Sequence, residues 1–328
     1  MTSPLPGSIT IEEGALRLAR GELVSFPTET VYGLGADATN PDAVSAIFSV
    51  KQRPPDHPVI VHIAKDVDPA SYFAQHVPRM AYRLIERFWP GPLTLILRRQ
   101  PEHAASAAGG QPSIGLRSPD HPLAQELLLK FKALSAAGGL AAPSANRFGR
   151  TSPTTAAHVR SELGGGVGII DGGPCRIGIE STILDMSRYE SIGPVLLRPG
   201  SVSERQLAEV LGSLPRTKDA AAPRASGTHS SHYAPSRPLY LVDAGDLIGL
   251  ASDVAVWSFS PPPAGHAATA NWKVAPATPE HYAIALYRVI RAFDAGHARA
   301  LYIEHPPKTE DWGAVNDRLG RAASPTPQ

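Results

Sequence analysis

With 328 residues the chain is long enough for two domains of roughly 150 residues each. Its 31 basic and 30 acidic residues nearly cancel and it has a single cysteine, Cys175, so neither a strong field for nucleic acid nor an internal disulfide is expected. The N-terminus lacks the pattern of a signal peptide and no apolar run reaches the ~18 residues of a membrane span, which predicts a cytoplasmic protein with no membrane insertion.

Through residue 211, short apolar runs typical of buried strands alternate with stretches of helical spacing. Strands are predicted at residues 23–26, 59–63, 93–97, 113–117, 140–146, 168–171, 181–186 and 195–197. The segment at residues 140–146 is expected to be extended up to its proline and to turn there. Helices are predicted at residues 9–20, 43–50, 79–88, 121–134, 153–161 and 203–211. Prolines and glycines mark most of the breaks between them. This order predicts an α/β fold with an open sheet, in which ligands lie beyond the strand ends.

The stretch P-T-E-T-V-Y-G-L-G at residues 27–35 follows the first predicted strand. Proline fixes the chain as it leaves the strand, and glycine allows a left-handed backbone or a close approach to a ligand. The hydroxyl and carboxylate side chains between them predict a turn that faces a ligand. An ordinary polar loop has the same local composition, so the choice between the two depends on the other strand ends.

Residues 214–236 are rich in Pro, Ala, Ser, Thr and His and have almost no large apolar side chain besides Tyr233, which predicts an irregular linker. Beyond it, residues 239–242, 254–257 and 300–303 are predicted strands, and residues 282–293 and 313–319 are predicted helices. They predict a smaller, Rossmann-like α/β domain. The expected boundaries are residues 1–212 for the first domain, 213–237 for the linker and 238–328 for the second domain.

Cations, hydroxyls and amides recur after the predicted strands of the first domain, without a matching run of acids. They are Thr28, Thr30, Lys51, Arg53, His57, His62, Ser113, Arg117, Ser144, Asn146, Ser181, Thr182 and Arg198, and the acid Glu29 stands among them. A single arginine after a strand is more often a surface ion pair, and a single histidine is more often a core residue. Their recurrence at successive strand ends instead predicts one shared cavity for a substrate that carries phosphate or carboxylate.

Other catalytic patterns are missing from the sequence. It contains no P-loop, no glycine pattern for a dinucleotide, no H-E-x-x-H or C-x-x-C metal motif and no G-x-S-x-G nucleophile elbow. Cys175 has no evident base partner, so covalent catalysis is not predicted. What remains is the binding and orientation of anionic substrates, with Mg²⁺ carried by a nucleotide.

A series of motifs closely resembles the threonylcarbamoyl-AMP synthase family and its YrdC-like domain. In chain order they are P-T-E-T-V-Y-G-L-G, K-x-R-P followed by H-P-V-I-V-H, F-W-P-G-P-L-T, I-G-L-R, A-P-S-A-N, S-P-T, E-S-T-I-L-D and L-R-P-G. The motif H-Y-A-P at residues 232–235 and the smaller domain after it resemble the longer, two-domain branch of the family. The resemblance covers nearly the whole chain and implies a YrdC-like twisted open sheet with a large cationic cavity.

The resemblance implies an enzyme, a nucleotidyltransferase that joins L-threonine, bicarbonate or CO₂, and ATP with its Mg²⁺ into threonylcarbamoyl-AMP and releases pyrophosphate. A tRNA threonylcarbamoyl transferase complex would then use the product to modify the adenosine beside the anticodon, and direct tRNA binding by this chain is not indicated. The amine of threonine would first become a carbamate, whose oxygen attacks the α-phosphorus of ATP. Both steps gather negative charge, so positioning and cationic stabilisation would be the main catalytic devices.

The resemblance also assigns residues. For threonine it implies Thr30, His62, Arg117, Ser181 and the strand backbone at Ala142, with Arg117 holding the substrate carboxylate. For ATP and the carbamate it implies Lys51, Arg53, His57, Ser113, Ser144, Asn146, Ser152, Arg198, His232 and Tyr233, with Lys51 and Arg53 as the catalytic cations and no metal ligand in the chain. The linker that carries His232 and Tyr233 is expected to close over the cavity as a lid.

The chain departs from the family's pattern at two places. His57-Pro58-Val59 stands where the family commonly has an asparagine before P-L, and S-G-T-H-S-S at residues 226–231 stands where glycine-methionine and basic residues are usual. The ligand contacts at these positions stay open.

Two alternatives come from other function classes. An RNA-binding module predicts clustered, exposed Lys and Arg with interleaved aromatic residues, whereas here single cations stand among small polar residues. A carbamoyltransferase of the same fold is the other alternative, and such enzymes carry zinc-finger and acylphosphatase modules that have no counterpart in this sequence.

Overall fold

The computed structural model describes residues 5–135, 137–228, 232–266 and 271–324. The chain divides into two compact units. Unit 1 comprises Met1–Phe148, Pro153–Arg176 and Glu180–Thr228, and unit 2 comprises Gly149–Ser152, Ile177–Ile179 and His229–Gln328. Two short segments that interrupt unit 1 in the sequence therefore belong to the unit of the C-terminal region.

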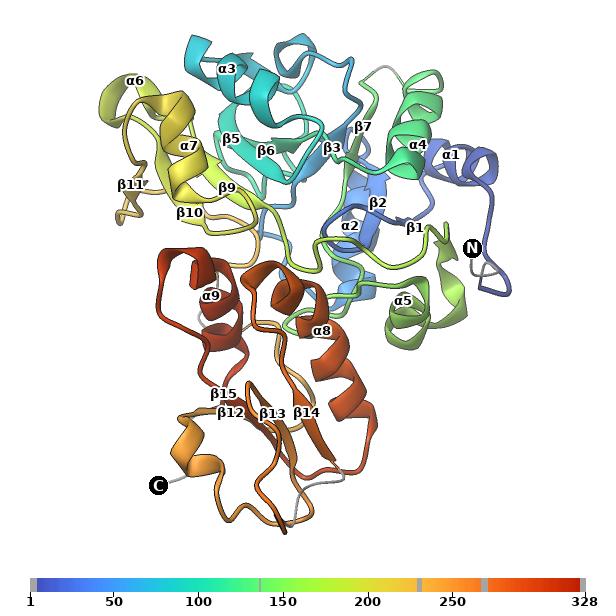
Figure 1. Cartoon of the computed structure of the whole chain (residues 1–328). Helices are drawn as coiled ribbons and strands as arrows, with labels where there is room; N and C mark the ends of the chain where they lie inside the picture. The colour runs from blue at the N-terminus through green and yellow to red at the C-terminus, as the bar shows by residue number, and fades with distance from the viewer. Residues whose placement is uncertain (1–4, 136, 229–231, 267–270, 325–328) are drawn as a thin grey trace. The chain divides into compact units, whose positions relative to one another are not determined.

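Unit 1 is built on one large sheet with helices packed against it (Figure 1). Its strands are β1 (Val24–Phe26), β2 (Gly33–Asp37), β3 (Val61–Ile63), β4 (Ala74–His76), β5 (Leu93–Arg99), β6 (Ser113–Arg117), β7 (Gly139–Ala141), β8 (Gly168–Ile169), β9 (Thr182–Asp185), β10 (Val195–Arg198) and β11 (Arg216–Thr217). Its α-helices are α1 (Ile11–Ala19), α2 (Pro41–Lys51), α3 (Arg79–Phe88), α4 (Pro122–Lys132), α5 (Ala156–Leu163), α6 (Tyr189–Ile192) and α7 (Glu204–Leu211). Every strand and helix expected in this part of the chain has a counterpart. β2, β4, β11 and α6 were not predicted from the sequence.

The sheet is mixed, with the strand order β11-β10-β9-β5-β6-β3-β7-β2-β1-β8, and β4 pairs with β5. Parallel pairing of β3 with β6 places His62 opposite Arg117. Parallel pairing of β5 with β9 places Leu93 opposite Thr182, directly after Ser181. Strands that are distant in the sequence thus bring predicted site residues to neighbouring positions.

The predicted turn at residues 27–35 is shorter than expected. β1 and β2 form an antiparallel hairpin in which Phe26 lies opposite Gly33, so residues 27–32 are the connection and the prediction was wrong for residues 33–35. A Cβ atom on Gly35 would lie 2.9 Å from Cε1 of Phe26. Glycine is needed there because the Phe26 ring packs closely across the neighbouring strand, and not because the chain turns.

Side chains alternate across the sheet, and this alternation separates the core from the site face. On β5, Leu95 and Leu97 belong to the main hydrophobic core with helices α2 and α3, whereas Ile96 belongs to a smaller cluster on the opposite face. Ala225, from the predicted linker, packs in that smaller cluster. Residues 222–226 therefore cover part of the face that carries the predicted site residues.

Unit 2 contains a parallel sheet in the order β12-β15-β13-β14, formed by β12 (Leu239–Val242), β13 (Ala255–Ser258), β14 (Trp272–Val274) and β15 (Leu301–Glu304). Helices α8 (Pro279–Ala295) and α9 (Gly313–Ala322) accompany it (Figure 1). Trp257 of β13 stacks on Tyr282 of α8 with ring centroids 4.1 Å apart. The parallel order confirms an α/β domain, and β14 is the strand that the sequence analysis missed.

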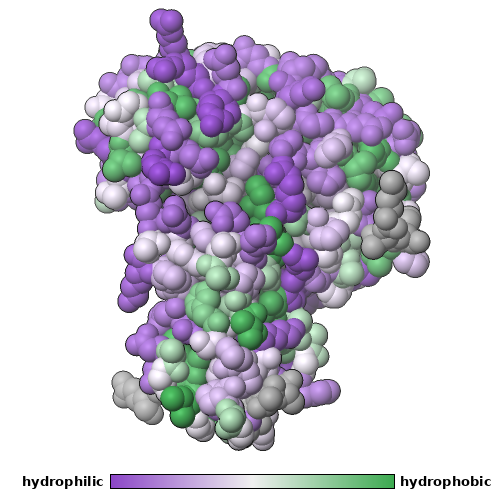
Figure 2. Space-filling model, viewed as in Figure 1, coloured by the Kyte–Doolittle hydropathy of each residue, from purple (hydrophilic) through white to green (hydrophobic). Residues whose placement is uncertain are grey.

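Hydrophilic residues cover most of the face seen in Figure 2, and hydrophobic residues form smaller groups among them. None of the helices in the described ranges is long and apolar enough to cross a membrane.

We expect Gly139→Ala to destabilise the fold because β7 passes directly over a buried ring. An added Cβ would lie 2.3 Å from Cζ of Phe73 and 3.0 Å from Cγ1 of Val61, both fully buried. Such overpacking costs about 1–3 kcal/mol. Urea unfolding measures the loss, with Gly166→Ala as the control, since nothing lies within 4 Å of a Cβ added there. Equal stability of the two variants would contradict the prediction.

Candidate active site

The β1–β2 connection holds its hydroxyl groups in fixed positions. Thr28 Oγ1 donates to the carbonyl of Val31 at 2.6 Å and lies 2.8 Å from Thr30 Oγ1, and both threonines are buried. Thr28 therefore orders the turn and fixes the hydroxyl of Thr30, the residue that was predicted to touch threonine.

Arg117, at the end of β6, forms an ion pair with Glu29 of the same connection. Arg117 Nη2 lies 2.7 Å from Glu29 Oε1, and the two side chains are 4% and 0% exposed. Arg117 Nε also donates to the carbonyl of Gly91 at 3.2 Å. Glu29 is the neighbour that the sequence analysis left without a role. The sequence feature that could have indicated its role is that Glu29 is an acid among many cations. A buried carboxylate needs a cationic partner, so a pairing with one of them could have been expected.

His62 lies beside Arg117 on β3, and its ring meets Phe26 edge-on with centroids 6.0 Å apart. Burial, and secondarily the charge of Arg117, lowers the pKa of His62 to about 3. The imidazole is therefore neutral at physiological pH. Nδ1 of His62 has no hydrogen-bond partner among the residues that the structure describes, so it is available to a ligand. The backbone of Ala142, the other threonine contact predicted here, is fixed by an N–H bond to the carbonyl of Ile60 at 2.9 Å.

Ser181 and Arg198 form a second group next to β5. Arg198 donates from Nε and Nη2 to the carbonyl of Ser181 at 3.0 and 2.8 Å, and from Nη1 to the carbonyl of Ser226 at 2.9 Å. The Ser181 hydroxyl lies 2.8 Å from that of Thr94. A residue predicted for threonine and one predicted for ATP are thus in direct contact, and the arginine also holds the linker.

Lys51 ends α2, whose N-terminus is capped: the side chain of Asn40 accepts from two backbone N–H groups and Pro41 follows. Lys51 Nζ donates to the carbonyl of Ser144 at 2.6 Å and to that of Asn146. Burial lowers the pKa of this amine well below its usual value, with the charge of Arg53 as a second cause. The lysine therefore ties α2 to the loop after β7, which carries two of the predicted ATP contacts.

Arg53 and His57 stand on the proline-rich loop that follows α2. Arg53 Nη2 donates to the carbonyl of Pro58 at 2.7 Å, and its guanidinium lies 5.8 Å from the centre of the Phe148 ring. The ring of His57 lies 5.3 Å from the same phenylalanine. Phe148 thus holds together two side chains that were predicted to face ATP.

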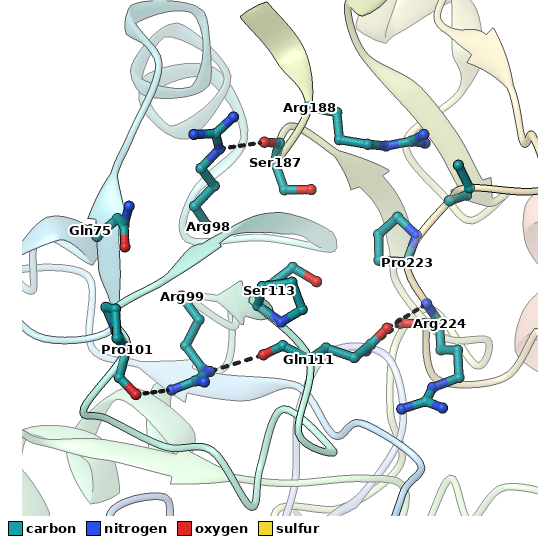
Figure 3. Close-up of a pocket in the computed structure, with 13 residues that line it drawn as sticks. Gln75, Arg98, Arg99, Pro101, Gln111, Ser113, Ser187, Arg188, Pro223 and Arg224 are labelled. Carbon is teal, nitrogen blue, oxygen red and sulfur yellow. Dashed lines mark hydrogen bonds between the residues drawn. The ribbon is translucent and has the colours of Figure 1, made fainter. Parts of the chain in front are cut away.

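Ser113 lines a different part of unit 1, a cavity of about 690 Å³ that Figure 3 shows in close-up. Its lining includes Arg98, Arg99, Arg188 and Arg224 and no carboxylate. Arg99 donates to four backbone carbonyls and Arg188 pairs with Asp185 and Asp219. The arginines bind mainly to the protein itself, and Ser113 is the one predicted site residue in this lining.

Ser152, His232 and Tyr233 belong to unit 2. Tyr233 is 1% exposed and has the left-handed φ of 66°. Its ring lies 5.4 Å from the guanidinium of the fully buried Arg318 and stacks on Tyr287 of α8. Its carbonyl accepts from Thr151 Oγ1 at 3.0 Å. Packing inside unit 2 therefore fixes the H-Y-A-P motif.

Two further observations concern other chemistry. Burial raises the pKa of the Cys175 thiol to about 12, so this cysteine is not a nucleophile at neutral pH. The described residues include no group of three or more His, Cys, Asp or Glu side chains that could hold a metal ion.

The lowered pKa of His62 predicts a loss of stability in acid. Its folded value of about 3 lies below the ordinary 6.5, so the unfolded chain binds the proton first as the pH falls. The contribution of neutral His62 to the free energy of unfolding is therefore complete above about pH 6.5. It declines towards pH 3 by at most about 1.4 kcal/mol per pH unit. Urea unfolding of the wild type and of His62→Gln between pH 7 and 4 measures it.

The stability of His62→Gln should fall less steeply over that range. The exposed His297→Gln serves as the control and should follow the wild type. Parallel curves for all three proteins would show that His62 is not responsible.

Known proteins share this arrangement of sequence and fold. A family model described as "Telomere recombination", covering Sua5, YciO and YrdC, matches residues 17–200, and one described as "Threonylcarbamoyl-AMP synthase, C-terminal domain" matches residues 202–324. The chain is similar to the threonylcarbamoyl-AMP synthase of Bacillus subtilis, with 44% identity over 71% of this chain and 66% of the relative. It is also similar to that of Pyrococcus abyssi, with 42% identity over 71% of this chain and 69% of the relative.

Each of these two alignments therefore leaves about a third of the relative unmatched, whereas the match to a solved structure is more complete. The crystal structure of P. abyssi Sua5 complexed with L-threonine has a TM-score of 0.84 to this chain at 34% identity, covering 95% of this chain and 94% of that one. The chain belongs to the threonylcarbamoyl-AMP synthase family, in its Sua5 form with a YrdC domain and a Sua5 C-terminal domain.

Proposed function

We propose that this protein is an L-threonylcarbamoyladenylate synthase, which forms threonylcarbamoyl-AMP and pyrophosphate from L-threonine, bicarbonate or CO₂, and ATP. The observation that carries the proposal is the buried Arg117 beside the neutral His62 and the fixed hydroxyl of Thr30. Together they offer a cation, an imidazole and a hydroxyl to a small polar acid. The similar P. abyssi protein was solved with L-threonine bound.

Threonine is proposed to bind through Thr30, His62, Arg117, Ser181 and the backbone at Ala142. Arg117 would hold the carboxylate, because guanidinium and carboxylate form strong charge-assisted hydrogen bonds. A neutral His62 would accept or donate one hydrogen bond without adding a second positive charge.

ATP is proposed to contact Arg53, His57, Ser113, Ser144, Asn146, Ser152, Arg198, His232 and Tyr233, with Lys51 and Arg53 as the catalytic cations. Lys51 acts partly through its two carbonyl bonds, which fix the loop that bears Ser144 and Asn146. Arg53 is the stronger candidate for charge that develops at the α-phosphorus, since a fixed cation stabilises that charge without reorganisation. Mg²⁺ would arrive with the phosphates of ATP.

The linker is proposed to act as a lid that keeps water from the reactive mixed anhydride. In support, Gln111 binds both the N–H and the carbonyl of Arg224, at 2.8 and 3.1 Å, and the Ser226 hydroxyl donates to the carbonyl of Pro58 at 2.7 Å. Residues 229–231 of the predicted linker lie outside the described residues. The product would pass to a tRNA threonylcarbamoyl transferase complex in the cytoplasm.

The test of the reaction is an assay for pyrophosphate and for a threonine-containing adenylate, with threonine, bicarbonate and Mg·ATP omitted in turn. The proposal requires that each omission abolish both products. ATP turnover that does not depend on threonine would point to another reaction catalysed by this fold. RNA binding without ATP turnover would favour an RNA-binding module.

We expect Arg53→Ala to lower the rate of adenylate formation by about 100-fold or more, because a fixed donor to developing charge is lost. The variant should keep a melting temperature close to that of the wild type. Arg83→Ala, which removes an exposed arginine of α3, is the matched control and should keep full activity. Near-normal activity of Arg53→Ala would remove this residue from the catalytic set.

We expect Gln111→Leu to loosen the linker, because it removes both hydrogen bonds to the backbone of Arg224, worth about 0.5–1.5 kcal/mol each. Trypsin should then cleave after Arg224 faster than in the wild type, and the adenylate should hydrolyse sooner. Gln75→Leu is the control because Gln75 lines the same cavity and, within the described residues, makes no hydrogen bond to the linker. Unchanged cleavage and unchanged product lifetime would contradict the lid.

A further inference from the structure

Glu29 is a fully buried carboxylate within the proposed threonine site, where it pairs with Arg117. Within the described residues, neither of its oxygens has a hydrogen bond of good geometry, although Oε1 lies 2.7 Å from Arg117 Nη2. A buried carboxylate normally accepts several hydrogen bonds, because an incompletely paired buried charge is costly. The unused hydrogen-bond acceptor capacity of Glu29 therefore indicates that a ligand supplies a hydrogen-bond donor at this place.

The pair offers two opposite charges side by side. Arg117 uses Nε for Gly91 and Nη2 for Glu29, and no protein partner of Nη1 exists in the described part of the chain. An α-amino acid carries its carboxylate and its ammonium group on the same carbon atom. A guanidinium in contact with a carboxylate can therefore bind both groups of one substrate molecule.

The other titratable groups around Glu29 do not compete for that role. The charge of Glu29 acts on His121 and Cys175, and His62 lies next to Arg117. Burial lowers the pKa of both histidines and raises that of the thiol, so all three are neutral at pH 7. Glu29 is then the negative group that faces Arg117 from the β1–β2 connection.

We propose that Glu29 binds the α-ammonium group of threonine and accepts its first proton when the amine is carboxylated. The proposal rests on the proposed function, since it names the residue that handles the amine in that reaction. Glu29 would thus be a catalytic residue that touches the reacting nitrogen.

The chemistry balances with bicarbonate as the carbon source. The ammonium group gives one proton to Glu29, and the nitrogen lone pair forms the new N–C bond. The C–O bond of bicarbonate breaks and its hydroxide leaves, taking the second proton of the nitrogen as water. The product is the carbamate anion, and Glu29 returns its proton to solvent before the next cycle.

The test compares threonine with its analogue 2,3-dihydroxybutanoate, in which a hydroxyl replaces the α-amino group. Calorimetry measures the binding of each to the wild type and to Glu29→Gln. Threonine should bind about 10- to 100-fold more weakly to the variant, because a charged hydrogen bond is lost. The analogue should bind both proteins alike, because it has no ammonium group. If both ligands weaken equally, Glu29 only orients Arg117 and the proposal is wrong.

Two further variants keep the test decisive. Glu29→Asp retains the charge, so it should still prefer threonine to the analogue even if its overall affinity falls. The exposed Glu86→Gln on α3 is the control and should bind both ligands like the wild type. If Glu29→Gln does not fold, loss of the preference in Glu29→Asp would overturn the proposal.

A rate measurement separates the proton transfer from binding. At saturating threonine, Glu29→Gln should form adenylate slowly at pH 7 and recover as the pH approaches the pKa of the free amine, which then loses its proton unaided. A deficit that stays constant with pH would overturn the role as proton acceptor. A wild type that binds no threonine at all would refute the proposed function, whereas normal threonine binding by Glu29→Gln would refute only the role of Glu29.

Discussion

A guanidinium buried at the end of β6 is the constraint on which the rest of the candidate site depends. Arg117 is almost fully withdrawn from water, and an uncompensated charge in such a place would be very costly. The β1–β2 connection supplies the carboxylate of Glu29, and the strand register brings a neutral His62 beside it. The ion pair of Arg117 and Glu29 holds the β1–β2 connection against the sheet. It also leaves hydrogen-bond donors on the guanidinium and acceptors on the carboxylate for a zwitterionic ligand.

Cationic side chains elsewhere in unit 1 can both fix loops and stabilise charge. Lys51 and Arg198 donate mainly to backbone carbonyls in the structure and so fix the loop after β7, Ser181 and the linker. Such contacts preorganise the groups around a charged substrate, which is the main requirement for a reaction that needs positioning more than covalent chemistry. The same residues can therefore shape the site and stabilise charge.

Local patterns predicted the elements well, and the contacts between elements poorly. The strand at residues 113–117 and the helix at residues 79–88 have the predicted bounds because apolar periodicity and flanking prolines define them. The contact between His62 and Arg117 depends on the pairing of β3 with β6, which no local pattern encodes. Glu29 was placed at the site, but its pairing with Arg117 was missed for the same reason, since that partner is distant in the sequence. The roles of the site residues toward threonine and ATP stay predictions.

Residues 149–152 and 177–179 limit how the C-terminal region can be lost or gained in evolution. Arg150 pairs with Asp294 at 3.0 Å, and a Cβ on Gly178 would lie 2.5 Å from the carbonyl of Ala283, so both loops are fitted to α8. A gene shortened after residue 212 would leave these loops with a surface shaped for a helix that no longer exists. Loss or gain of the C-terminal region in the course of evolution would therefore require compensating substitutions in two loops that lie well upstream in the sequence.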